Sequence, residues 1–284
     1  MSDCVQRFLL ENLDIRGAIV RLDTVWQQML SGRHYPHRVA QLLGEMSATT
    51  LLLRNNLKQA GRLTIQLMGD GPISMLVIDC NESLHIRSMA KCLQQIESQS
   101  VSDLLGRGQL LLTLDMPAIH ETYQSIVPMD GHNIAEIFEH YFKQSEQLPS
   151  RLFLITTEQF IFGLMLQKLP AADRLDPDGW TRIEAMTATL YDQTLLELAT
   201  EEILIRLFHE ETIRIFDAHT VHYGCQKNPA KIYAMLRLLG RKEVDSILKE
   251  FGEVIVNDEM CNHQYRLDAL AVDALFREAE STLH

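Results

Sequence analysis

Apolar side chains recur at helical spacing from Arg38 to Lys58, and Gly61 follows where a glycine commonly ends a helix. From Leu63 to Met68, apolar and polar residues alternate, so the hydrophobic period is two residues. The turn residues Gly69 to Pro72 separate this segment from the apolar run Met75 to Ile78. The pattern predicts a core-facing helix followed by a strand, a tight turn and a second strand.

Short apolar runs bounded by turn residues predict further strands in the same region. They are Leu84 to Met89, Gln109 to Leu114, Thr122 to Val127, Arg151 to Thr156 and Phe160 to Leu166. A helical period returns between His132 and Ser145, ahead of Pro149. Helices and strands therefore alternate over residues 1–172, which we expect to form an α/β core domain around a mixed β-sheet.

Prolines and acidic residues interrupt the pattern between Pro170 and Gly179, which indicates a domain boundary. Short helical segments follow at Trp180 to Leu190 and Glu201 to Phe208. We therefore expect a helical linker domain over residues 173–211 and a separate C-terminal domain over residues 212–284. The fold class as a whole is predicted to be α+β.

The predicted C-terminal domain begins with a strand and continues mostly as helices. The segments are a strand at Thr212 to Phe216, helices at Pro229 to Leu239 and Lys242 to Phe251, a short strand at Val254 to Val256 and a last helix at Asp268 to Glu278. A domain this small buries little apolar surface. We expect a metal ion or a cross-link to stabilise it.

Composition narrows the class of protein. The 284-residue chain is 46% hydrophobic, enough for a folded core, but its formal net charge of −12 disfavours nucleic-acid binding, which needs clustered Lys and Arg. No apolar run reaches the roughly 18 residues of a membrane span, and the first residues lack a signal-peptide pattern. The five cysteines are scattered and odd in number, so reduced thiols are expected. We expect a cytoplasmic protein without membrane or nucleic-acid partners.

The sequence carries no catalytic signature that we recognise, such as G-x-S-x-G, a phosphate-binding Gly-Lys-Ser/Thr loop, H-E-x-x-H or G-x-G-x-x-G after a strand. The glycines between Gly69 and Pro72 fit a hairpin turn. His209 and Glu210 are adjacent on a predicted helix end and cannot face one ligand together. We therefore expect no catalytic residues and no enzymatic activity.

Short stretches in order along nearly the whole chain match one family: Asn12 to Gly17, Leu67 to Pro72, Tyr141 to Phe153, Leu207 to Glu211 and Glu243 to Leu248. Together they resemble the 33 kDa heat-shock protein family, the redox-regulated holdase chaperones. The resemblance implies an α/β core, a helical linker wrapped on it and a C-terminal zinc-binding redox-switch domain. It also implies ATP-independent binding of unfolding client proteins. Under oxidative stress, family members release zinc, form disulfides and loosen the linker, which exposes apolar surface.

In that family, a C-x-C pair and a C-x-x-C pair bind zinc. The matching positions here are Cys225-Gln226-Lys227 and Asp258-Glu259-Met260-Cys261, so each pair has lost one cysteine. Lys227 also places a cation where a thiolate would bind the metal. We expect no metal and a degenerate redox switch, with Asp258, His222 and His263 as the alternative ligands.

The replaced positions suggest two further features of this domain. Lys227 and Asp258 carry opposite charges and would form an ion pair, which would contribute only about 0 to 1 kcal/mol. Cys225 and Cys261 would occupy the other two corners of the former site. They would be close enough for a disulfide if their Cβ atoms point toward each other, with two inert reduced thiols as the alternative.

The leading prediction is an ATP-independent holdase that binds unfolded proteins and prevents their aggregation, with a degenerate zinc and thiol switch. The alternative is an interaction protein that kept the fold and lost holdase activity, and an uncharacterised enzyme is a third. The sequence leaves open whether the chain forms a homodimer.

Overall fold

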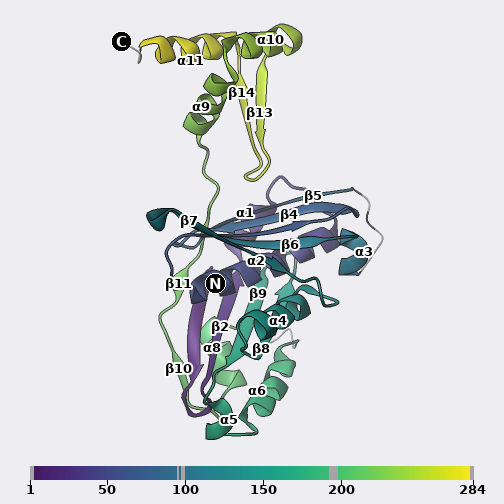
Figure 1. The fold of residues 1–284 in the computed structure, drawn as a ribbon, viewed down its shortest axis with the longest axis vertical. Coiled ribbons are helices and arrows are strands. Elements are labelled where there is room, and N and C mark those ends of the chain that lie inside the picture. The colour runs from purple at the N-terminus through teal and green to yellow at the C-terminus, as the bar shows by residue number, and fades with distance from the viewer. Residues whose placement is uncertain (1–2, 95, 97–99, 192–197, 282–284) are drawn as a thin grey trace. The chain divides into compact units, whose positions relative to one another are not determined.

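The computed structural model of this chain describes residues 3–94, 96, 100–191 and 198–281. The chain folds into two compact units, Met1–Gly224 and Cys225–His284 (Figure 1). The first unit contains two six-stranded sheets, and the second contains a two-stranded sheet with helices.

Sheet A of the first unit is built from antiparallel pairs. Its order is β10 (Ile213–Ile215), β1 (Cys4–Leu10), β2 (Ile15–Leu22), β9 (Ile161–Lys168) and β8 (Ser150–Thr156), with β11 (His219–Thr220) also beside β1. β8 and β9 match predicted strands, whereas β1 and β2 had no predicted counterpart. β2 is buried on both faces and therefore carries an almost continuous apolar run in place of an alternation.

Sheet B contains the strands predicted in the middle of the sequence. Its order is β12 (His222–Tyr223), β5 (His85–Cys92), β4 (Ile73–Cys80), β3 (Arg62–Met68), β6 (Gln109–Met116) and β7 (Glu121–Val127). β12 pairs with β5 in parallel, and the other pairs are antiparallel. The first unit thus has two sheets where the sequence led us to expect one.

Helix α2 (His37–Asn56) lies between the two sheets and contacts strands of both. The sequence predicted one buried face, but a sheet covers each side and most of the helix is buried. The hydroxyls of Ser47, Thr49 and Thr50 donate to backbone carbonyls four residues earlier, so these polar groups are satisfied inside the core.

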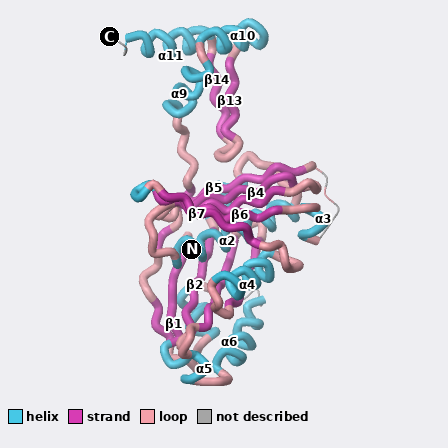
Figure 2. Tube along the Cα trace, in the orientation of Figure 1, coloured by secondary structure: helices cyan, strands magenta, loops and turns pink. Residues whose placement is uncertain are grey.

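Shorter helices surround this core (Figure 2). They are α1 (Thr24–Leu30), α3 (Val101–Leu105), α4 (Ile134–Ser145), α5 (Ala172–Leu175), α6 (Gly179–Thr187) and α8 (Thr200–Leu207), with 3-10 turns η1 (Glu11–Leu13), η2 (Pro117–Ile119) and η3 (Ala188–Tyr191). α4 confirms the helix predicted from His132 to Ser145. The Asn133 side chain begins it by accepting a hydrogen bond from the Glu136 backbone N–H.

The second unit contains α9 (Pro229–Leu239), α10 (Arg241–Phe251), β13 (Val254–Asp258), β14 (His263–Leu267) and α11 (Ala269–Ser281). Its helices match the predicted ones, and β14 completes an antiparallel hairpin with β13. A small apolar core joins the helices to the hairpin, with Val244, Val254 and Leu267 among its buried members.

The second unit begins at Cys225, and not at Thr212 as the sequence suggested. The strands between residues 213 and 223 belong to the first unit because they pair with β1 and β5. The predicted linker, residues 173–211, also lies within the first unit. A three-residue strand such as β10 carries no sign in the sequence of which sheet it joins.

Candidate functional site

One face of sheet A is apolar and lies beneath α6, η3 and α8. The sheet contributes Phe8, Leu10, Ile15, Ile19, Phe162, Leu164 and Leu166, and the helical cover contributes Ile183, Leu190, Ile203, Leu204, Leu207 and Phe208. We call the seven sheet residues the covered face. All of these side chains are buried, and the rings of Phe8 and Phe208 pack with centroids 5.5 Å apart.

The cover depends on packing because its helices are short. α8 spans eight residues, and helices of this length are marginal in water without tertiary contacts. Its stripe of Ile203, Leu204 and Leu207 is buried, whereas Ile205 points away and is 54% exposed. Each large apolar side chain that is fully buried contributes about 1.5–3 kcal/mol. If α8 left the covered face, we expect it to lose its helical structure as well.

Charged side chains hold the cover at its edges. Arg182 of α6 donates to Glu211 at 2.8 Å and to Asp176 at 2.9 Å. These two carboxylates, Glu211 first, raise the pKa of Arg182 above its ordinary value. Arg151 of β8 donates to Glu184 of α6 at 2.5 Å, and this contact ties the cover to the sheet.

Near the start of α8, a side-chain contact of Gln6 joins the cover to β1. Gln6 donates to Glu201 at 3.0 Å and, with the same amide group, to the backbone oxygen of Phe216 at 3.0 Å. Gln6 is 3% exposed, so its amide would lose the Glu201 partner of a buried polar contact if α8 moved away.

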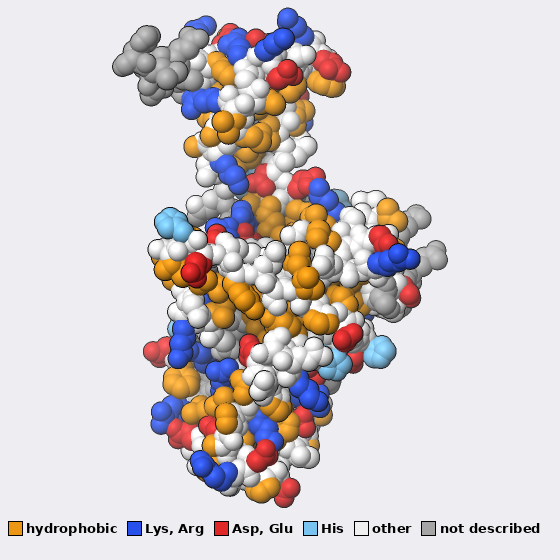
Figure 3. All heavy atoms as spheres, in the orientation of Figure 1, with side chains coloured by type: hydrophobic (Ala, Val, Ile, Leu, Met, Phe, Trp, Pro, Cys, Tyr) orange, Lys and Arg blue, Asp and Glu red, His pale blue; other side chains and the backbone are white. Residues whose placement is uncertain are grey.

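Exposed apolar side chains also lie on and beside the edge strand β7 of sheet B. Ile119, Tyr123 and Ile126 each expose more than half of their surface, on β7 and the turn before it. β7 is an edge strand of sheet B, so it also offers unpaired backbone groups to another chain. In Figure 3, hydrophobic side chains gather around β6 on the visible face of this unit.

The second unit brings together the two cysteines that sequence reasoning singled out. Cys225 and Cys261 are joined in a disulfide, with Cα atoms 5.2 Å apart and both residues buried. The bridge closes a segment of 36 residues that includes α9, α10 and β13. Nearby, the Asn228 backbone N–H donates to the Tyr265 hydroxyl at 2.9 Å. Both contacts tie the start of the unit to its hairpin.

The ion pair suggested between Lys227 and Asp258 is not formed: among the described residues, no ion pair joins these two side chains. Asp258 instead accepts a hydrogen bond from the Cys261 backbone N–H at 3.2 Å, across the turn between β13 and β14. A local bond of this kind orders few groups, whereas an exposed ion pair must fix a long lysine side chain for little gain.

The residues at the former zinc positions do not fit a zinc site. The sulfurs of Cys225 and Cys261 are bonded to each other, and a lysine cannot replace a thiolate ligand. Of the alternative ligands, His222 pairs within sheet B beside His85, while His263 keeps a buried Nδ1 without a hydrogen-bond partner. The described part of the chain gathers no three His, Cys, Asp or Glu side chains that could hold a metal ion.

The remaining thiols have no redox partner among the described residues. Cys4, Cys80 and Cys92 are free. Burial raises the pKa of Cys80 to about 12 and also raises that of Cys92. A thiol with a raised pKa stays protonated at neutral pH and is therefore a poor nucleophile.

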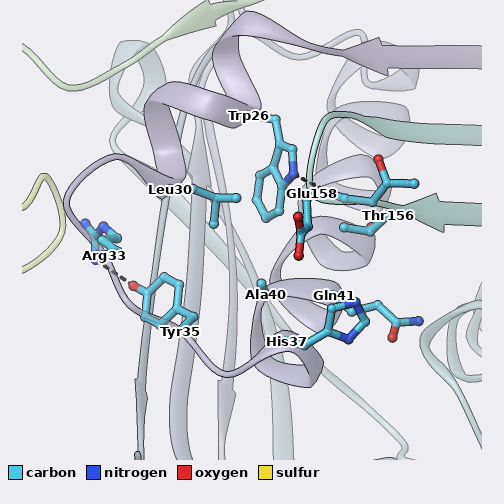
Figure 4. A pocket seen from close by; sticks show the side chains of 10 residues that line it. Trp26, Leu30, Arg33, Tyr35, His37, Ala40, Gln41, Thr156 and Glu158 are labelled. Atoms are coloured by element: carbon cyan, nitrogen blue, oxygen red, sulfur yellow. Dashed lines mark hydrogen bonds between the residues drawn. The ribbon is translucent and has the colours of Figure 1, made fainter.

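A pocket of about 210 Å³ lies between α1, the start of α2 and the end of β8 (Figure 4). Trp26 forms its wall and donates from its indole nitrogen to the Thr157 backbone oxygen at 2.9 Å. His37 and Glu158 also line it. Among the described lining residues, no nucleophile is hydrogen-bonded to a general base, so the pocket does not define a reaction.

Comparison of the whole fold with solved structures shows what it resembles. The crystal structure of the 33 kDa chaperonin (heat shock protein 33 homologue) from Thermotoga maritima matches with a TM-score of 0.81, covering 99% of this chain and 100% of that one at 21% identity. The two-unit architecture with a helix-covered sheet is therefore that of the 33 kDa chaperonins, which confirms the predicted α+β class.

Sequence comparisons match nearly the full length of this chain to the same kind of protein. The chain is 37% identical to the 33 kDa chaperonin of Methylobacillus flagellatus over 97% of this chain and 95% of that protein. It is 38% identical to the one of Nitrosococcus oceani, over 97% and 95%. The family model described as Hsp33 protein matches residues 3–268. The chain belongs to the Hsp33 protein family, which confirms the resemblance found in the sequence.

Proposed function

We propose that this chain is an ATP-independent holdase that binds unfolding proteins through apolar surface and keeps them from aggregating. One observation carries the proposal: an apolar sheet face lies beneath short helices that depend on packing for their structure. The relatives are named chaperonins, which favours a chaperone over an enzyme. Among the described residues, no helix is long and apolar enough to cross a membrane.

Zinc release would not control whether the covered face becomes exposed. The donor set at the former zinc positions does not fit the metal, so the Cys225–Cys261 bridge and the apolar core would hold the second unit together. Heat, or any condition that melts α8, would then be the trigger. The proposed clients are unfolded proteins in the cytoplasm, with homodimer formation as a further state to test.

The test is light scattering by a thermally unfolding client protein mixed with the chain, without ATP. We expect the chain to slow client aggregation. We expect the Ile203→Asp variant to slow aggregation more than the unchanged protein does, and to do so at a lower temperature. A charge at this buried position costs about 3 kcal/mol or more, which would free α8 from the covered face.

Ile205→Asp is the matched control, since it places the same charge on the exposed side of the same helix. It should behave as the unchanged protein does. If no condition or variant suppresses client aggregation, the chain is the fold-conserved interaction protein. Equal effects of the two substitutions would mean that the covered face is not the client surface.

A further inference from the structure

A cleft of about 360 Å³ opens in the first unit where α2 ends above sheet A. Its lining comes from β1, β2, the end of α2 and two later segments. The residues that matter are Arg7, Arg16, Asn55, Lys58, Leu169 and Phe216. The cleft lies on the side of sheet A that faces α2, away from the covered face.

Strand register brings two of the cations together. Arg16 stands opposite Leu9, and Arg7 is two residues from Leu9 on the same strand, so both arginines project from one face as diagonal neighbours. The Arg7 guanidinium lies 5.8 Å from the centre of the Phe216 ring. Lys58, two residues beyond the end of α2, completes a group of three cations around one opening.

No carboxylate is among the described residues that line this cleft, although the chain carries a net charge of −12. The side-chain partner of Arg16 is the neutral Gln167 oxygen at 2.9 Å. The Gln167 amide is held in place by Glu146 at 3.3 Å and Ser150 at 3.2 Å. Neither Arg7 nor Lys58 forms an ion pair with any described residue.

One more donor in the wall lacks an acceptor. The Asn55 amide nitrogen is buried without a hydrogen-bond partner among the described residues, while its oxygen contacts His219 at 3.0 Å. A buried donor without an acceptor is costly, and three neighbouring like charges repel one another. An anion in the cleft would relieve the repulsion between the cations.

We propose that this cleft binds a small phosphate monoester whose organic part is a ring. Three cations match a phosphate group, which carries about −1.5 to −2 charges at pH 7, better than a single carboxylate. Guanidinium groups also match phosphate oxygens in geometry. The cleft exceeds what a free phosphate ion fills, and Leu57, Leu169 and Phe216 supply an apolar surface for a ring.

The test is calorimetric titration of the full-length protein with AMP, with adenosine and inorganic phosphate as separate arms. We expect AMP to bind more tightly than either part alone, and to bind more weakly at pH 5, where the phosphate gains a proton. Arg7→Gln and Lys58→Gln should each weaken AMP binding by about tenfold or more, because each removes a charged hydrogen-bond donor.

Arg7 and Lys58 are both exposed, so these substitutions should leave the fold intact. Lys143→Gln, on the exposed side of α4, is the control for overall charge and should bind AMP normally. Absence of AMP binding, equal binding of inorganic phosphate, or equal loss in the Lys143 variant would overturn the proposal. So would binding of an acidic peptide in place of AMP.

Discussion

At the scale of single residues, the second unit departs at two positions from the zinc site that the sequence resemblance implies. Lys227 and Asp258 occupy the two positions where that resemblance implies cysteines, and no ion pair joins them among the described residues. The surviving cysteines meet in one bridge, which spans a longer loop than a bridge within either former pair would. Closing a longer loop removes more entropy from the unfolded chain.

The bridge should therefore stabilise the second unit measurably. We expect reduction, or Cys225→Ser with Cys261→Ser, to lower its free energy of unfolding by about 3–4 kcal/mol, the value for a loop of this size. Urea unfolding followed by amide hydrogen exchange in β13 and β14 measures it. Cys92→Ser is the control. Equal midpoints with and without reductant would show that the thiols are not bridged in solution.

Glu45 predicts a pH effect in the first unit. Burial raises its pKa, and the hydrogen bond from Gln41 and the charge of Arg38 offset this only in part. A carboxyl group whose pKa is higher in the folded chain than in the unfolded chain lowers stability as pH rises through that interval. Glu45→Gln should therefore raise the urea midpoint at pH 7 and change it little at pH 4.

Glu121→Gln, on exposed β7, is the control for this measurement, because it removes an exposed charge whereas Glu45→Gln removes a buried one. It should leave both midpoints nearly unchanged. If Glu45→Gln raised the urea midpoint equally at pH 4 and pH 7, the added stability would not come from removing the ionised form of Glu45.

At the scale of elements, the sequence predicted the strands and helices whose apolar residues follow a clear period. The strands β3 to β9 and the helices α2, α4, α9 and α10 follow such patterns and match the predicted segments. β1 and β2 do not, because β2 is covered on both sides and its apolar run has no period. The partners of β10 to β12 could not be predicted, since two or three residues carry no register information.

The candidate site was predictable only in part. The cysteine positions could be read from the sequence, because spacing within the pairs is local. The covered face could not, since it joins strands and helices up to about 200 residues apart, such as Phe8 and Phe208. The cationic cleft was missed for the same reason: Arg7, Lys58 and Phe216 are distant in the chain.

The two-sided burial of α2 makes a prediction at Gly44. A Cβ there would overlap the Thr156 side chain on β8. Gly44→Ala should therefore destabilise the first unit by about 1–3 kcal/mol, although alanine is otherwise preferred to glycine in a helix by about 1 kcal/mol. Chemical denaturation measures the change.

Thr156→Ala in the same chain supplies the matched test of this contact, because it removes the two nearest atoms, Cγ2 and Oγ1, and leaves only the Cβ at 3.0 Å. The double variant should recover most of the lost stability. A Gly44→Ala protein as stable as the original, or one that Thr156→Ala does not rescue, would contradict the close packing of α2 on β8.

At the scale of the whole molecule, the two units have separate means of stability. The first buries large apolar clusters between and on its sheets, whereas the second has a small core and one covalent bridge. This agrees with the proposal that the chain keeps the covered apolar face of the family fold without a zinc-dependent switch. Under the proposed function, exposure of that face would be set by the stability of the helical cover.

Zinc content tests this arrangement most directly. The full-length protein is purified under reducing conditions, incubated with zinc, passed through gel filtration and measured for metal per chain. We predict far less than one zinc per chain, and a second unit that unfolds at the same urea concentration with or without a chelator. One tightly held zinc per chain, lost together with the fold of the second unit when a chelator is added, would contradict it.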